Sequence, residues 1–289
     1  MEKIRKKERK GHIEYKSHAK INLFLDVLTK RQDGYHNIRT IFSEIEIYDL
    51  LSFSLTKKGD VRILSDKDFV SVEKNLIYKV ALFIKDTYQV KDGVEVTLKK
   101  NIPIAAGLGG GSSNAAVTIL ALNELWNLKL QNSDFHEIAE KFGSDINFFL
   151  EGGTALGEER GNKITPLDDL ICENIFLVNP GFGISSKDAY DRVELSSQPE
   201  TSWQNLITSG NPKYCYNKLE AGIRHSYPEI AESLNFMKEN GATNAMLSGS
   251  GPTMIGFCPD RQTAEKFAEY FSKKRYWNCI TKTIKRRSK

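Results

Sequence analysis

The chain has 289 residues, of which 40% are hydrophobic and 27% charged, and this balance is that of an ordinary globular protein with one large or two modest domains. The net charge of +4 comes from the basic ends, residues 1–10 and 282–289, so the net acidic stretch between them argues against a nucleic-acid groove across the body. The four cysteines and five histidines show no spacing typical of a disulfide scaffold or a metal site, no apolar run could span a bilayer, and no signal peptide is evident. We therefore expect a cytoplasmic protein with no bound structural metal, whose two basic ends are solvated tails.

The first half of the chain is predicted to contain three strands. Residues 21–28 and 41–47 are rich in β-branched and apolar residues, and the turn-forming sequence Gln32-Asp33-Gly34 lies between them. Residues 93–99 alternate between apolar and polar side chains, which is the pattern of a half-buried strand.

A glycine-rich loop follows the third strand. Residues 103–113 read Pro-Ile-Ala-Ala-Gly-Leu-Gly-Gly-Gly-Ser-Ser, and apolar residues then recur at helical spacing from Ala116 to Trp126. Ser112 or Ser113 would suit the N-cap of this helix. Glycines allow close backbone approach to a phosphate, and the first helical turn offers unpaired N–H groups at the positive end of the helix dipole. The loop is therefore predicted to bind phosphate.

Other phosphate-binding motifs match this loop less well. A Walker A loop requires a lysine, and none occurs between Asn101 and Trp126. The dinucleotide fingerprint fails at its third glycine, where Ser112 stands, and the preceding strand alternates instead of being uniformly apolar. A glycine turn without a ligand stays open, although so many glycines lose considerable backbone entropy on folding.

Three polar residues outside the loop also have purely structural explanations. Asp145 follows Gly143-Ser144 and could be the N-cap of a helix. Lys20 stands in an otherwise apolar strand, where a lone lysine usually points to solvent. His36 follows a turn and could be satisfied by nearby backbone groups.

The second half of the chain alternates strands and helices. Strands are predicted at residues 176–178, 245–248 and 253–258, and helices at residues 229–239 and 261–274. Because strands and helices mix in both halves, the expected class is α+β.

Three segments, in order, resemble the motifs of the GHMP family of small-molecule kinases. They are Ala19-Lys20-Ile21-Asn22-Leu23, the loop at 103–113 and Leu247-Ser-Gly-Ser-Gly-Pro-Thr253. The resemblance implies the two-domain GHMP kinase fold, with a ribosomal-protein-like N-terminal domain and a ferredoxin-like α+β C-terminal domain. We place these domains at residues 1–165 and 166–289.

Three shorter segments resemble one branch of that family, whose members act on 4-diphosphocytidyl-2-C-methyl-D-erythritol. They are Asp-Gly-Tyr-His at 33–36, Gly-Ser-Asp-Ile-Asn-Phe-Phe at 143–149 and Gly-Gly-Thr-Ala-Leu-Gly at 152–157. This resemblance implies transfer of the γ-phosphate of ATP to the 2-hydroxyl, giving the 2-phosphate and ADP, in the non-mevalonate route to isoprenoid precursors. ATP and Mg²⁺ are the implied cofactors. The expected partner is this small molecule, with no nucleic acid or membrane, and the chain is expected to be a monomer or weak homodimer.

The resemblance also implies catalytic and nucleotide-binding residues. Asp145 matches the catalytic aspartate of the family and Lys20 the lysine beside it. A carboxylate would accept the hydroxyl proton, and the lysine would keep it ionised and offset charge on the transferring group. The implied nucleotide-binding residues are Pro103, Ile104, Ala105, Ala106, Gly107, Leu108, Gly109, Gly110, Gly111, Ser112 and Ser113.

Four further residues are implied to bind the acceptor. His36 matches the residue that reads the cytosine edge, and Tyr35 lies beside it. Tyr190 falls where the family places an aromatic residue that stacks on cytosine, an interaction worth about 1–3 kcal/mol. Asn22 could orient the same site as Lys20.

Two alternative functions stay open. The chain could be a GHMP kinase for homoserine, mevalonate or a sugar, although such kinases lack the Asp-Gly-Tyr-His segment. It could also bind RNA, because the N-terminal half of such kinases resembles a ribosomal protein and both ends are basic. The catalytic-looking Lys20 and Asp145 speak against the second alternative, since fold analogy alone is a poor basis for function.

Overall fold

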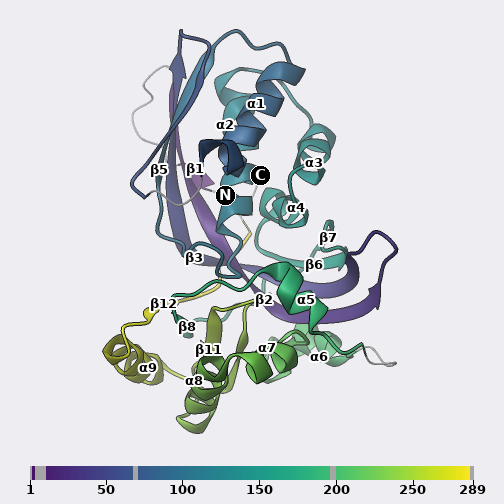
Figure 1. Ribbon diagram of the computed structural model, residues 1–289, viewed down its shortest axis with the longest axis vertical. Coiled ribbons are helices and arrows are strands. Elements are labelled where there is room, and N and C mark those ends of the chain that lie inside the picture. Colours follow the sequence, from purple (N-terminus) through teal and green to yellow (C-terminus); the bar gives the residue numbers. More distant parts are fainter. Residues whose placement is uncertain (1, 4–10, 68–70, 196–199, 287–289) are drawn as a thin grey trace. The chain divides into compact units, whose positions relative to one another are not determined.

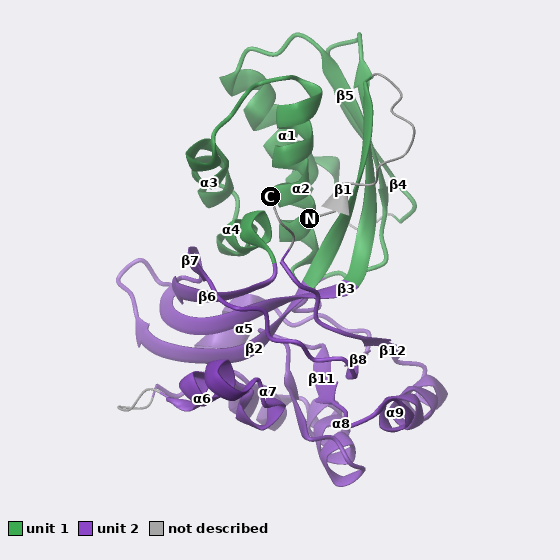
Figure 2. Ribbon diagram, turned by 180° about the vertical axis from the view of Figure 1, so that it is seen from behind, with its two compact units in different colours: residues 1–19, 47–104, 109–152 green, residues 20–46, 105–108, 153–289 purple. Residues whose placement is uncertain are grey.

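The computed structural model describes residues 2–3, 11–67, 71–195 and 200–286. The chain forms two compact units, each assembled from separate stretches of sequence (Figure 2). Unit 1 comprises residues 1–19, 47–104 and 109–152, and unit 2 comprises residues 20–46, 105–108 and 153–289. The units therefore interleave along the chain, and the division into family domains at residue 165 stays a prediction.

Unit 1 contains part of a mixed sheet and a group of helices (Figure 1). Strand β5 (Gly93–Lys99) pairs antiparallel with residues 50–56 of β3 (His36–Thr56) and parallel with β4 (Val61–Ser65). The helical elements of unit 1 are η1 (Val72–Lys74), α1 (Leu76–Thr87), α2 (Gly110–Leu125), α3 (Asn132–Glu140) and α4 (Ser144–Glu151). Helix α2 contacts the other three α-helices and is buried on most sides, as expected of a helix with apolar residues all round.

Unit 2 contains an antiparallel sheet with the order β10-β11-β8-β12. Its strands are β8 (Ile175–Asn179), β10 (Asn244–Leu247), β11 (Met254–Phe257) and β12 (Trp277–Thr281). Helix α8 (Pro228–Glu239) packs on β10 and β11, and helix α9 (Arg261–Lys273) packs on β8 and β12. With β8 as the first strand and β12 as the fourth, this is the ferredoxin-like order, so the predicted fold is confirmed.

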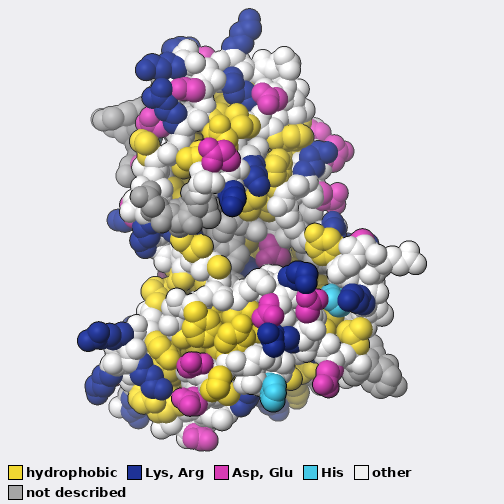
Figure 3. All heavy atoms as spheres, in the orientation of Figure 1, with side chains coloured by type: hydrophobic (Ala, Val, Ile, Leu, Met, Phe, Trp, Pro, Cys, Tyr) yellow, Lys and Arg dark blue, Asp and Glu magenta, His cyan; other side chains and the backbone are white. Residues whose placement is uncertain are grey.

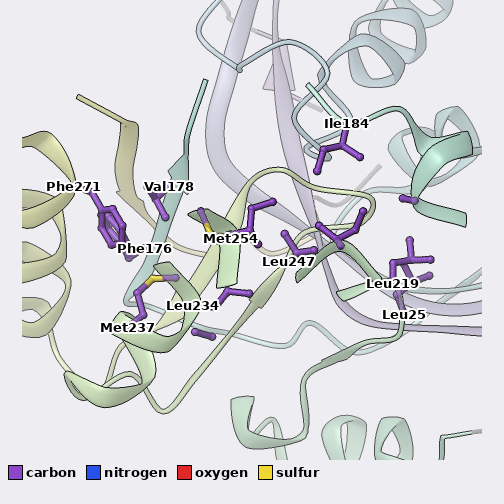
Figure 4. Packing of buried hydrophobic residues seen from close by; sticks show 14 of the residues in the cluster. Leu25, Phe176, Val178, Ile184, Leu219, Leu234, Met237, Leu247, Met254 and Phe271 are labelled. Carbon is purple, nitrogen blue, oxygen red and sulfur yellow. The ribbon is translucent and has the colours of Figure 1, made fainter. Parts of the chain in front are cut away.

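The core of unit 2 is one buried apolar cluster. Figure 4 shows Phe176 and Phe271 together at one end of the cluster, Leu219 and Leu25 at the other, and Leu247 between them. Because protein interiors are close-packed, the elements that carry these side chains hold one another in place.

Two long strands supply residues to both units. Strand β2 (His12–Lys30) pairs parallel with β9 (Tyr216–Asn217), and β3 pairs antiparallel with β6 (Thr154–Glu159) through residues 38–43. The remaining elements are β1 (Glu2–Lys3), β7 (Lys163–Pro166), α5 (Ser186–Asp191), α6 (Ser202–Ser209), η2 (Pro212–Tyr214) and α7 (Glu220–Ser226).

The prediction of a solvated basic tail is wrong for residues 282–286. The backbone N–H of Thr283 donates to the carbonyl of Cys172 at 3.0 Å, and the backbone N–H of Arg286 donates to the carboxylate of Asp169 at 2.7 Å. These residues are ordered because a backbone carbonyl and a side-chain carboxylate from the rest of unit 2 accept their N–H groups. Residues 4–10 and 287–289, the remainder of the basic ends, lie outside the described residues.

The described surface mixes the two signs of charge. On the face shown in Figure 3, Lys and Arg side chains are interspersed with Asp and Glu on both units. Within the part of the chain that the structure describes, no helix has the length and apolar character needed to cross a membrane.

Candidate active site

The glycine loop leads into helix α2 in unit 1. The helix begins at Gly110, and Gly109 is its N-cap with φ 68° and ψ 12°, a left-handed conformation that glycine adopts without strain. The predicted N-cap at Ser112 or Ser113 is therefore wrong. Ser113 lies one turn inside the helix, where its buried hydroxyl accepts a hydrogen bond from Ser17 at 2.7 Å. The backbone N–H groups of the first turn have no acceptor one turn earlier within the helix, so they remain suited to an anion.

The predicted loop is divided between the units. Residues 105–108 belong to unit 2, and the flanking residues of the loop belong to unit 1. Ala105 has a φ of 52°, in the left-handed region that favours glycine. Ala106 and Leu108 are buried, whereas Ile104 is 46% exposed. Ala106 and Leu108 therefore anchor the loop, whereas Ile104, which precedes them, is exposed.

A buried ion pair lies against the first residue of α2. Lys100 and Asp49 are 5% and 0% exposed, and the ammonium group donates to the carboxylate. Asp49 also accepts the backbone N–H groups of Asn101 and Ile102 at 2.8 and 2.9 Å. Burial lowers the pKa of Lys100, and the attraction of Asp49 opposes that shift. A methyl group on Gly110 would lie 2.9 Å from Lys100 Nζ, so the pair supports the start of the helix directly.

Replacing Asp49 by Asn is expected to destabilise the protein by about 3–5 kcal/mol, because it leaves the buried Lys100 ammonium unpaired. The double variant Asp49→Asn/Lys100→Met should recover part of that loss, since no buried charge remains. Urea unfolding of wild type, both single variants and the double variant measures this. If Asp49→Asn unfolds at the wild-type urea concentration, the pair does not stabilise the loop.

Lys20 and Asn22 lie together in unit 2. Lys20 is only 4% exposed, and its Nζ donates to Asn22 Oδ1 at 2.7 Å. The amide of Asn22 donates to the hydroxyl of Thr40 at 2.7 Å, which fixes the orientation of the amide. The backbone N–H of Lys20 donates to the carbonyl of Leu108 at 3.0 Å, joining β2 to the glycine loop. The interpretation of Lys20 as a solvent-facing strand lysine is therefore wrong.

The third motif forms a tight turn against Lys20 and the loop. Ser248 Oγ donates to the carbonyl of Gly107 at 3.1 Å. A methyl group on Gly107 would come within 2.1 Å of the Ser248 carbonyl oxygen. A methyl group on Gly249 would lie 3.1 Å from Asn22 Oδ1 and 3.4 Å from Lys20 Nζ. Three motifs that are distant in sequence thus meet in unit 2, with no room for a side chain at Gly107.

His36 and Tyr190, the predicted cytosine-binding residues, are in contact. Their rings are stacked with centroids 5.3 Å apart and an interplanar angle of 20°. Burial and the nearby charge of Lys30 lower the pKa of His36, and Asp191 opposes this shift. The imidazole is therefore mostly neutral at pH 7, and in that form one nitrogen can donate and the other can accept.

Tyr35 projects from the turn before β3 and is 57% exposed. The guanidinium of Arg160 lies 4.9 Å from its ring centroid, a cation–π contact. Asp33 accepts the backbone N–H of Tyr35 at 3.1 Å and pairs with Arg31, which shapes the turn. Arg160 was not predicted, because its contact with Tyr35 depends on the pairing of β3 with β6.

Asp145 lies in the first turn of α4, in unit 1. The N-cap of this helix is Gly143, so the alternative explanation of Asp145 as the N-cap is wrong. Ile146 and Phe148, which follow it in α4, are fully buried and hold the helix in place. Because Asp145 and Lys20 belong to different units, their pairing stays a prediction.

Comparison with family models matches both parts of the chain. Residues 75–153 match the GHMP kinases N terminal domain, and residues 197–276 match the GHMP kinases C terminal domain. A protein of Clostridium novyi called 4-diphosphocytidyl-2-C-methyl-D-erythritol kinase is 37% identical over 93% of this chain and 99% of the relative. A protein of the same name from Thermodesulfovibrio yellowstonii is 38% identical over 93% of this chain and 97% of the relative.

Solved structures show the same architecture. The crystal structure of a 4-(cytidine 5'-diphospho)-2C-methyl-D-erythritol kinase matches with a TM-score of 0.81 and 28% identity, over 94% of this chain and 99% of that chain. A homoserine kinase from Cytophaga hutchinsonii matches with a TM-score of 0.69 over 98% of both chains. At 18% identity, the second match shows the fold alone.

Proposed function

This chain belongs to the GHMP kinase family, and on that premise we propose that it phosphorylates the 2-hydroxyl of 4-diphosphocytidyl-2-C-methyl-D-erythritol with ATP. The observation that carries the proposal is the buried Lys20–Asn22 pair, which lies against the glycine loop and the third motif. An ammonium held there can offset charge on a transferring phosphoryl group. The choice of acceptor is supported by the names of the two relatives, which this chain matches over nearly their whole length.

In the proposed reaction the protein mainly positions the two substrates and stabilises the charge of the transferring group. Phosphoryl transfer passes through a loose transition state, so the acceptor hydroxyl loses its proton as its bond to phosphorus forms. Asp145, which lies in the first turn of α4, accepts that proton. Lys20 offsets the charge on the transferring group, and Asn22 fixes the direction of its ammonium.

The nucleotide is proposed to bind as MgATP. Backbone N–H groups at the start of α2 and in the glycine loop hold its phosphates. Among the described residues no group of three His, Cys, Asp or Glu side chains could hold a metal ion. Because Mg²⁺ is usually bound through one or two carboxylates, waters and substrate phosphates, we assign it to the nucleotide and not to a protein cage.

The cytidine end of the acceptor is proposed to bind at His36 and Tyr190, with Tyr35 beside them. A neutral imidazole can donate to one atom of the cytosine edge and accept from another. The aromatic ring of Tyr190 offers a surface for base stacking. The stacked arrangement of His36 and Tyr190 supports this placement, because one base could contact both rings.

The protonation of His36 should be visible in the pH dependence of acceptor binding. Because burial lowers its pKa, the KM for the cytidyl substrate should begin to rise at a lower pH than it would for a free imidazole, since protonation removes the acceptor nitrogen. His36→Asn should raise that KM about tenfold, remove the acid limb and leave the KM for ATP unchanged. An equal rise in both KM values would place His36 outside the acceptor site.

The proposal is tested by offering one acceptor at a time with ATP. ADP release should be fast with 4-diphosphocytidyl-2-C-methyl-D-erythritol and stay at background with homoserine, mevalonate and galactose. Fast release with any of the last three would replace the proposed acceptor while leaving the kinase family in place.

A further inference from the structure

Asn217, at the end of β9, is a buried side chain whose amide is fully used by the backbone. Its Nδ2 donates to the carbonyls of Leu247 and Gly249 at 2.9 and 2.8 Å. Its Oδ1 accepts the backbone N–H of Leu219 at 3.0 Å. Both donors and the acceptor of one amide are therefore committed, which leaves it a single orientation.

A second side chain from the same segment holds the same turn. Glu220 Oε2 accepts the backbone N–H of Leu247 at 3.1 Å, and its other oxygen pairs with Arg224 at 3.2 Å. Leu247 is thus bound at its N–H by Glu220 and at its carbonyl by Asn217. Leu219 and Leu247 also belong to the buried cluster of unit 2, so the segment that carries both polar side chains is itself anchored (Figure 4).

The turn that Asn217 holds is the one that meets Lys20. Gly249 has a φ of 56°, and the position of a methyl group on it would lie 3.4 Å from Lys20 Nζ. A shift of the Gly249 backbone would therefore change the space available to the ammonium and to the Asn22 amide.

We propose that Asn217 is a positioning residue for phosphoryl transfer, which sets the place of the Gly249 turn relative to Lys20, with Glu220 supporting the same turn. This inference rests on the proposed kinase activity and adds to it a residue outside the three motifs. A misplacement of about 1 Å at a reacting group can cost about 10²-fold in rate. Loss of the hydrogen bonds from Asn217 to Leu247 and Gly249 should therefore lower kcat.

Asn244 provides a matched control. Its Nδ2 also donates to two backbone carbonyls, those of Pro212 and Cys215, both at 2.9 Å. It lies in the same unit, at the opposite end of β10 from Leu247, about 10 Å along the strand. Its truncation removes the same kind of double hydrogen bond without touching the Gly249 turn.

The test compares Asn217→Ala with Asn244→Ala. Both variants should lower the thermal midpoint, but only Asn217→Ala should lower kcat, by about 10²-fold per folded molecule, with the KM for ATP changed much less. If Asn217→Ala does not fold, kcat is measured for Glu220→Ala and Glu220→Gln instead. The first should lower kcat, and the second, which keeps an oxygen acceptor for the Leu247 N–H, should recover most of the loss.

The possible outcomes distinguish a failure of this inference from a failure of the proposed kinase activity. Wild-type protein without activity on the cytidyl substrate would contradict the proposed function and the inference together. An active wild type whose Asn217→Ala and Asn244→Ala variants lose kcat equally, or whose Glu220→Ala variant keeps its kcat, would overturn the inference alone.

Discussion

Replacing Asp145 by Asn should lower kcat about 10²–10⁴-fold while the protein stays folded, because an amide of the same shape cannot accept the proton of the acceptor hydroxyl. The loss should appear at saturating ATP and acceptor, in a steady-state assay of ADP release. Stability should fall by at most about 1 kcal/mol, the value of a carboxylate at a helix N-terminus.

Asp134 is the control for this substitution. It also lies in the first turn of a helix of unit 1, α3, where it accepts the backbone N–H of Gln131 at 2.7 Å in a capping box. Asp134→Asn should cost similar stability through the weakened cap and leave kcat unchanged. A near-normal rate for Asp145→Asn would remove Asp145 from the mechanism, and equal losses in the two variants would reduce its role to that of a helix-start carboxylate.

Alanine at Gly107 should have the second large effect, a fall in kcat/KM for ATP of about 10²-fold or more. The added methyl group would lie 2.1 Å from the Ser248 carbonyl oxygen and 3.2 Å from the backbone nitrogen of Gly251. Both are backbone atoms, so the third motif and the glycine loop would have to separate. Such overpacking costs about 1–3 kcal/mol in addition to the strain of alanine at a φ of 75°.

Gly210 is the control that separates backbone strain from overpacking. It has a φ of 63° at the end of α6, and a methyl group there would meet nothing within 4 Å. Gly210→Ala should therefore show only the backbone strain of about 1–2 kcal/mol and keep the wild-type kcat/KM. If Gly107→Ala is as active as Gly210→Ala, the contact between the loop and the third motif does not matter for nucleotide use.

Local patterns in the sequence correctly predicted the helices and strands whose own residues show a clear periodicity. The alternating strand at residues 93–99 has the bounds predicted for it, and the helices predicted at 229–239 and 261–274 agree within one residue at each end. Strands β2 and β3 are much longer than their predicted segments. Their outer parts carry polar residues and become strands through pairing with distant segments, which no local pattern contains.

The candidate site was predictable where a motif or a strand period placed it. Lys20 and Asn22 stand two residues apart in a strand, so a shared face followed from the period alone. The start of α2 was not predictable in the same way, because serine is the commoner cap and only the left-handed conformation of Gly109 reveals the real one.

Long-range pairs were missed for a different reason. Lys100 and Asp49 are separated by 51 positions, and Asn217 and Gly249 by 32. None of these contacts leaves a periodic or spaced signal in the chain, since each exists only after the sheets have formed. Arg160, which lies over Tyr35, belongs to the same class.

The most direct test of the central claim is the phosphorus NMR spectrum of the product formed from ATP and 4-diphosphocytidyl-2-C-methyl-D-erythritol. Phosphorylation of the tertiary 2-hydroxyl predicts a new phosphomonoester signal without three-bond coupling to a proton, because the carbon that bears the oxygen carries no hydrogen. The diphosphate signals of the substrate should persist. A monoester signal split by neighbouring protons, which marks a primary or secondary hydroxyl, or no new signal at all, would contradict the account.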